Sequence, residues 1–91
     1  MAVLHMETEV ARDTQKTITA KHQEITASLQ QSSASINDLR SNWMGNSASQ
    51  FFQEYDQWND AMNRMLEEYA KMGSRLLSEI AEWEQTAARL E

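Results

Sequence analysis

Histidines and clustered carboxylates are the side chains of this chain that could bind a metal or move a proton. The two histidines, His5 and His22, are seventeen positions apart, so no two imidazoles lie one helical turn apart as they do in common zinc sites. His22 falls in the row of mainly apolar residues that recur at heptad spacing, which indicates a histidine packed between helices or at the edge of their contact. A pH-sensitive association surface is the alternative. We expect no metal site.

Acidic side chains form two clusters, Glu67 with Glu68 and Glu79 with Glu82 and Glu84. Paired carboxylates act as general acid and base where a pocket raises the pKa of one of them. Clusters on an open helix surface are instead solvated charges. The chain also has no glycine-rich phosphate loop and no recognisable pairing of a nucleophile with a base. We therefore predict that the protein is not an enzyme and takes no cofactor.

The composition indicates one small domain. The chain has 91 residues, 41% of them hydrophobic, and contains neither proline nor cysteine. Its net charge of −6 argues against nucleic acid or anionic lipid as a partner, because both attract basic surfaces. No apolar run reaches the ~20 residues of a membrane span, and residues 1–10 do not resemble a general secretory signal peptide.

The spacing of apolar residues predicts two long helices. In the first half they recur alternately four and three positions apart, the heptad period of a packed helix rather than the period of a strand. The second half continues this spacing with larger side chains and shifts by one residue after Leu76, as in a stutter. The residues expected to pack the hairpin or a dimer are Ile18, Ile25, Leu29, Ile36, Leu39, Phe51, Phe52, Tyr55, Trp58, Met62, Met65, Tyr69, Met72, Leu76, Ile80 and Trp83.

The tripeptide Trp43-Met44-Gly45, near the midpoint, is the strong interruption of this spacing. Gly45 suits the left-handed conformation just after a helix end. Ser47 and Gln50 fit a capping box that would begin the next helix. Trp43 is predicted to cover the end of the hairpin by packing near Phe51 and Phe52.

The two helices are predicted to form a single hairpin. Its parts are helix one at about 4–43, a turn at about 44–47 and helix two at about 48–90, within one domain of residues 1–91. Antiparallel partners should have residue numbers that sum to roughly 90, which places Tyr55 and Trp58 opposite the small side chains of residues 32–35. A two-helix rod leaves much of its apolar stripe in water, whereas two rods side by side bury it. The predicted fold is all-α, an antiparallel two-helix hairpin that dimerises into a four-helix bundle.

In length, helical pattern and its central Trp-x-Gly, the chain resembles the small WXG proteins of type VII secretion, the ESAT-like or ESX group. The resemblance covers the whole chain and implies that Trp43 and Gly45 form the turn. It implies export as a folded dimer, either a homodimer or a pair with a related WXG protein, and contact with a secretion ATPase or a larger toxin substrate. Such a protein is cytoplasmic before export, then secreted or at the cell surface, and associated with virulence.

The export signal of that family is Tyr-x-x-x-Asp/Glu after the second helix of one subunit, beside the Trp-x-Gly turn of its partner. This chain departs from that pattern, because the fourth residue after Tyr55 is Asn59 and the fourth after Tyr69 is Gly73. Either a partner supplies the signal or recognition uses another feature. Residues 47–91 hold nine acidic and four basic residues, which favours a more basic partner without excluding a homodimer.

Two other functions are compatible with the pattern. A membrane-active effector would use the aromatic second helix, although the acidic balance and the expected burial of the aromatic rings count against it. A coiled-coil adaptor unrelated to secretion would need the heptads alone. A multi-domain ATPase or a large helical toxin encoded nearby would favour secretion.

Overall fold

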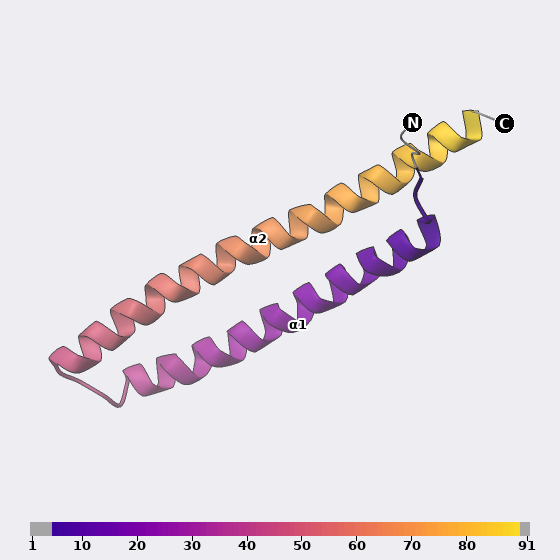
Figure 1. Cartoon of the computed structure of the whole chain (residues 1–91). Coiled ribbons are helices and arrows are strands. Elements are labelled where there is room, and N and C mark those ends of the chain that lie inside the picture. Colours follow the sequence, from indigo (N-terminus) through magenta and orange to yellow (C-terminus); the bar gives the residue numbers. More distant parts are fainter. Residues whose placement is uncertain (1–4, 90–91) are drawn as a thin grey trace.

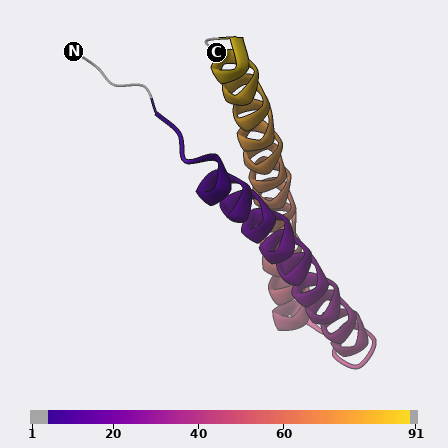
Figure 2. The same ribbon diagram turned by 90° about the vertical axis from the view of Figure 1, so that its right-hand side faces the viewer.

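The computed structural model describes residues 5–89, with the backbone alone for Arg89, and consists of two helices folded back on each other (Figure 1). Helix α1 spans Thr8–Arg40 and helix α2 spans Asn46–Arg89. The hairpin is a rod with extents of 69 × 23 × 16 Å. Seen from the side, the two helices are inclined to each other and cross in projection (Figure 2).

Helix α1 is shorter than predicted, because it ends at Arg40 rather than at about position 43. Residues 5–7 are not helical, and position 4 lies outside the described residues. Polar residues end the helix by bonding to its last carbonyl groups. The backbone N–H of Ser41 lies 3.2 Å from the carbonyl oxygen of Asp38, and that of Asn42 lies 2.8 Å from the carbonyl oxygen of Leu39. The side-chain amide of Asn42 also donates to the Asp38 carbonyl at 2.8 Å, so the end of α1 is satisfied before the glycine is reached.

The contacts between α1 and α2 have the predicted antiparallel register. The hydroxyl groups of Ser33 and Tyr55 share a hydrogen bond of 2.9 Å, so a large side chain does meet a small one here. Nearer the termini, Gly73 of α2 passes so close to Ile18 that a Cβ on the glycine would lie 3.0 Å from the Ile18 Cγ2 atom. At the open end, Arg12 and Glu84 form an ion pair.

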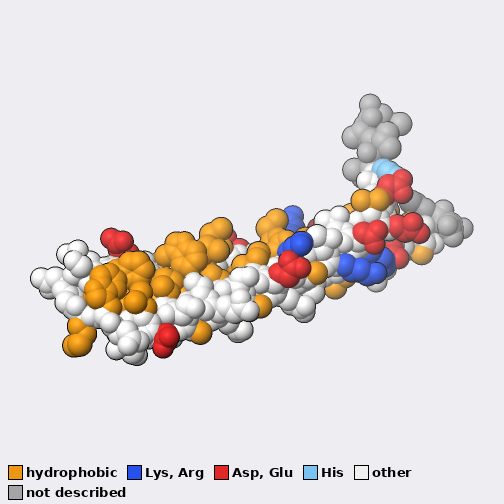
Figure 3. All heavy atoms as spheres, turned by 90° about the horizontal axis from the view of Figure 1, so that it is seen from below, with side chains coloured by type: hydrophobic (Ala, Val, Ile, Leu, Met, Phe, Trp, Pro, Cys, Tyr) orange, Lys and Arg blue, Asp and Glu red, His pale blue; other side chains and the backbone are white. Residues whose placement is uncertain are grey.

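The interior of the rod is thin. The buried hydrophobic side chains of the described residues are Leu29, Ala48, Phe52, Leu66 and Ile80. By contrast, ten large hydrophobic side chains are exposed among residues 5–88. Figure 3 shows that, on the face it draws, hydrophobic side chains gather over the half of the rod nearer the turn, while most charged ones lie towards the other end. The hairpin alone therefore leaves a large part of its apolar surface in water.

Candidate functional site

The turn between the helices comprises residues 41–45 and has a glycine at its end. Gly45 has a φ of +126°, a conformation that side-chain-bearing residues rarely adopt. Its carbonyl oxygen accepts the hydrogen bond of the Ser49 N–H at 3.0 Å, so Gly45 occupies the N-cap position of α2. The sequence prediction placed this glycine directly after the first helix. In the structure Gly45 lies four residues after Ser41, the C-cap of α1, because Ser41 and Asn42 have already ended that helix.

The predicted capping box of Ser47 and Gln50 does not form. Helix α2 begins at Asn46, so Ser47 lies inside the first turn rather than at the cap. Within the described part of the chain, neither of these two side chains makes a hydrogen bond. A capping box requires the serine at the N-cap position, which Gly45 occupies here. Ser47 lies two residues further into the helix, so its side chain cannot cap the N-terminal amides.

Gly45→Ala is expected to lower the free energy of unfolding by about 1–3 kcal/mol, the usual cost of a side chain in a disfavoured backbone conformation. A Cβ at this position would meet no atom within 4 Å, so the loss would come from the backbone alone. Urea unfolding followed by circular dichroism measures it. Met44→Ala is the matched control, since Met44 is exposed and its φ is not positive. Equal stability of the Gly45 and Met44 variants would contradict the turn geometry.

An aromatic cluster closes the elbow. The ring of Trp43 lies 5.6 Å from that of Phe51 and 5.7 Å from that of Phe52, and the two phenylalanine rings are 5.4 Å apart. These are distances and tilts at which aromatic rings attract one another. Phe52 is buried, whereas Trp43 and Phe51 keep part of their rings exposed. The predicted plug is thus shared by three rings, and its outer surface remains available for contact.

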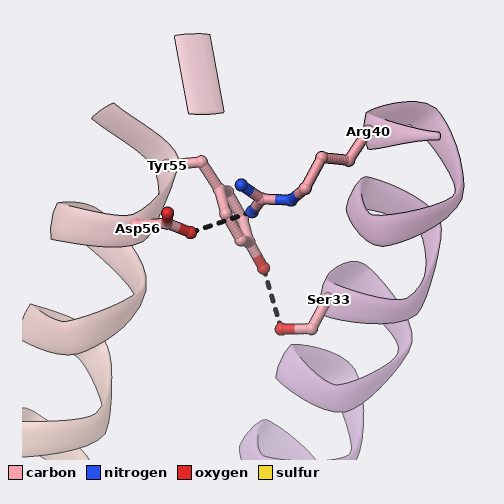
Figure 4. Close-up of polar contacts among 4 residues, drawn as sticks. All are labelled: Ser33, Arg40, Tyr55 and Asp56. Atoms are coloured by element: carbon pink, nitrogen blue, oxygen red, sulfur yellow. Dashed lines mark hydrogen bonds and ion pairs between the residues drawn. The ribbon is translucent and has the colours of Figure 1, made fainter. Parts of the chain in front are cut away.

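Arg40 ties the cluster to both helices. Its guanidinium carbon lies 4.7 Å from the centre of the Phe52 ring, within the range of a cation–π contact. The same group donates to Asp56 Oδ1 at 2.9 Å, while Tyr55, the residue before Asp56 on α2, points to Ser33 (Figure 4). Sequence analysis did not single out Arg40 or Asp56, because surface charges sixteen positions apart carry no periodic signal.

Exposed apolar side chains recur every seven residues, beginning with Met44 in the turn and continuing along α2 with Phe51, Trp58, Met65 and Met72. Two open grooves between the helices lie along this side. One is lined by Ile25, Met62, Met65, Leu66, Glu68, Tyr69 and Met72, and the other by Glu24, Ile25, Ser28, Leu29, Ser32, Trp58 and Met62. We call the surface formed by Ile25, Trp58, Met62, Met65, Tyr69 and Met72 the apolar face.

The residues predicted to pack fall into three groups in the hairpin. Leu29, Phe52 and Ile80 are buried. Ile18, Ile36, Tyr55, Met62, Tyr69, Leu76 and Trp83 are half-buried. Ile25, Leu39, Phe51, Trp58, Met65 and Met72 are exposed. Three further residues of the described part of the chain, Ala48, Leu66 and Gly73, are buried although the predicted packing residues did not include them. A glycine inside a helical pattern is the signal that could have identified Gly73 as a close approach.

The opposite side of the rod is polar. A groove there is lined by Thr26, Leu29, Gln30, Ser33, Ala34, Asn37, Asn59, Asn63 and Leu66. Amide and hydroxyl groups dominate this lining, and none of its side chains is charged. The hairpin therefore presents one apolar and one polar side, as a helical pair does when a single further partner covers it.

His22 lies between the helices. Its Nε2 atom donates to the backbone carbonyl oxygen of Leu66 at 3.1 Å, and its ring stacks on Tyr69 with centres 6.4 Å apart. The imidazole is half-buried. His22 thus acts as a hydrogen-bonded link between α1 and α2, and His5, paired with Glu7 at 2.8 Å, lies outside the helices.

Across residues 5–89, no group of three or more His, Cys, Asp or Glu side chains is arranged to hold a metal ion. Neither of the two described helices is apolar enough over a sufficient length to cross a membrane. The surfaces with a distinct chemical character are the elbow and the apolar face.

Comparison with known proteins gives one match. The model of the family WXG100, described as proteins of 100 residues with WXG, matches residues 4–86. This range includes both helices except the last turn of α2, and it centres on Trp43-Met44-Gly45. No curated protein and no solved structure matches the chain.

Proposed function

The chain belongs to the WXG100 family of ESAT-like secreted proteins, and on this premise we propose that it is a small type VII secretion protein exported as a folded helical dimer. The observation that carries the proposal is the family match over residues 4–86, with the Trp43-x-Gly45 motif at the junction of two long antiparallel helices. The proposed role is one of binding and escort rather than catalysis.

The apolar face supports dimerisation. Met65 and Met72 are 59% and 62% exposed in the single hairpin, and exposed hydrophobic rows of this length indicate an association surface. A second hairpin laid on this face would complete a four-helix bundle. We favour a second copy of the chain as the partner, and a related WXG protein is the alternative.

The export signal is proposed to come from a partner. Tyr55 is half-buried and hydrogen-bonded to Ser33, and Tyr69 stacks on His22, so both tyrosines serve the hairpin itself. Neither has an acidic residue four positions later. An escorted toxin or a related WXG subunit would therefore present the signal to the secretion ATPase, next to the elbow of this chain. Before export the protein would be cytoplasmic, and afterwards secreted or at the cell surface.

The oligomeric state is the first test. Light scattering after size exclusion, with circular dichroism on the same peak, should give a helical species of about twice 10.5 kDa. A poorly helical monomer would contradict the homodimer. Co-expression with a second WXG protein from the same organism then tests the mixed pair, since a soluble helical 1:1 complex would identify the partner.

Export is the second test. In the source organism, the chain should be recovered from the culture medium, and deletion of the membrane ATPase of type VII secretion should abolish its release. The same strain should still accumulate the chain inside the cell. Release that continues without the ATPase would contradict the proposed function, even if the protein is a dimer.

A further inference from the structure

Methionine supplies an unusual share of the exposed apolar surface. Met65 and Met72 are exposed on the apolar face, and Met44 at the elbow is 91% exposed. Thioether sulfur is oxidised by peroxides to a sulfoxide, which turns a flexible apolar side chain into a polar one. The three sulfur-bearing side chains are therefore accessible to a soluble oxidant in the single hairpin.

The surroundings of Met65 and Met72 suit a thioether and not a sulfoxide. The groove that contains them is otherwise lined by Ile25, Met62, Leu66, Glu68 and Tyr69. Of these side chains, the Tyr69 hydroxyl is the group that can donate a hydrogen bond, and an ionised Glu68 can only accept. A sulfoxide oxygen buried here by a second hairpin would lose its water and find too few donors, which opposes association.

We propose that Met65 and Met72 form an oxidation-sensitive site that controls association through the apolar face. A peroxide transfers one oxygen to each sulfur: the O–O bond breaks, an S=O bond forms, the sulfur loses two electrons and water or an alcohol leaves. The modified hairpin is then held apart from its partner. This inference rests on the proposed dimer, because it requires the apolar face to be the dimer surface.

Association also protects the site. In a dimer built on the apolar face, Met65 and Met72 are covered, so their rate of oxidation falls as the protein concentration rises. Oxidation thus acts on the dissociated chain and prevents its return. Enzymatic reduction by methionine sulfoxide reductases of both stereochemical specificities reverses the modification and restores association.

The test uses the full chain treated with hydrogen peroxide, which is then removed by catalase. Peptide mass mapping locates each sulfoxide, and sedimentation equilibrium gives the dimer dissociation constant. We expect sulfoxides at Met65 and Met72 and a dissociation constant raised by about tenfold or more. Circular dichroism confirms that the oxidised chain remains helical at high concentration.

Leucine variants separate the sites. The double variant Met65→Leu/Met72→Leu keeps the volume and apolarity of the face, so it should dimerise as before and resist peroxide. Met44→Leu removes a thioether outside the groove and should remain as sensitive as the parent chain. An unchanged dissociation constant after both sulfoxides have formed would overturn this inference and leave the proposed dimer intact. A chain that is monomeric before oxidation would overturn both.

Discussion

Phe52→Ala is expected to lower the free energy of unfolding by about 3–5 kcal/mol, the usual cost of truncating a buried aromatic side chain. Phe52 is 6% exposed and is one of the few buried hydrophobic residues of the rod. Its ring contacts Trp43 and Phe51 and lies under the Arg40 guanidinium, so the alanine variant would lose all three contacts together. Small domains have a total free energy of unfolding of roughly 5–15 kcal/mol. The loss expected for Phe52→Ala is therefore a large part of the stability of the hairpin.

The neighbouring ring provides the control. Phe51 is 40% exposed and belongs to the same cluster, so Phe51→Ala should cost roughly 1–2 kcal/mol, in proportion to its smaller burial. Urea unfolding at equal protein concentration compares the two variants, because the stability of a dimer depends on concentration. Equal losses for Phe51 and Phe52 would mean that a partner covers Phe51 as fully as α1 covers Phe52. A larger loss for Phe51 would contradict the orientation of α2 described here.

The helices and their register could be predicted from the sequence because both depend on spacing alone. A heptad period specifies a helix, and folding the chain at Gly45 brings Tyr55 to Ser33. The shift of the seam after Leu76 also has a structural counterpart, since Ile80 is almost completely buried. These features follow from periodicity, which adjacent residues reinforce.

The elbow could not be predicted in the same way, because a helix end is decided by a few competing hydrogen bonds. Ser41 and Asn42 bond to the last carbonyl groups of α1, which ends the helix at Arg40 and moves Gly45 to the start of α2. The predicted capping box fails for the same reason. Side-chain capping of this kind is local and nearly equal in energy among alternatives, so sequence pattern does not choose between them.

The division of the apolar stripe also required the structure. Spacing places Met62 and Met65 in one stripe, but the rotation of α2 about its axis makes the first half-buried and leaves the second exposed. That rotation depends on which side chains meet α1, including the close approach of Gly73 to Ile18. The side chains of α2 that α1 leaves exposed can therefore be identified only from the packed structure of the two helices. They form the surface on which the proposed dimer depends.

Met65→Glu is expected to raise the dimer dissociation constant by about 100-fold or more, because association would bury a carboxylate in an apolar groove. The side chain is 59% exposed in the single hairpin, so the glutamate is solvated there and the hairpin itself loses little. In a homodimer, each copy would carry the new charge. The residues that line the groove with Met65 include no lysine or arginine to pair with it, and Glu68 already supplies a negative charge.

Asn63→Glu is the matched control, since it adds the same charge two residues away on the polar side of the rod. Sedimentation equilibrium of both variants should show a dissociated Met65→Glu chain and an Asn63→Glu dimer like that of the parent. The reverse result would assign the dimer surface to the polar groove of Gln30, Asn37 and Asn59. Both substitutions make the same change in net charge and differ only in the face that receives it. The pair of variants therefore tests which side of the hairpin associates, and it does so without a measurement of export.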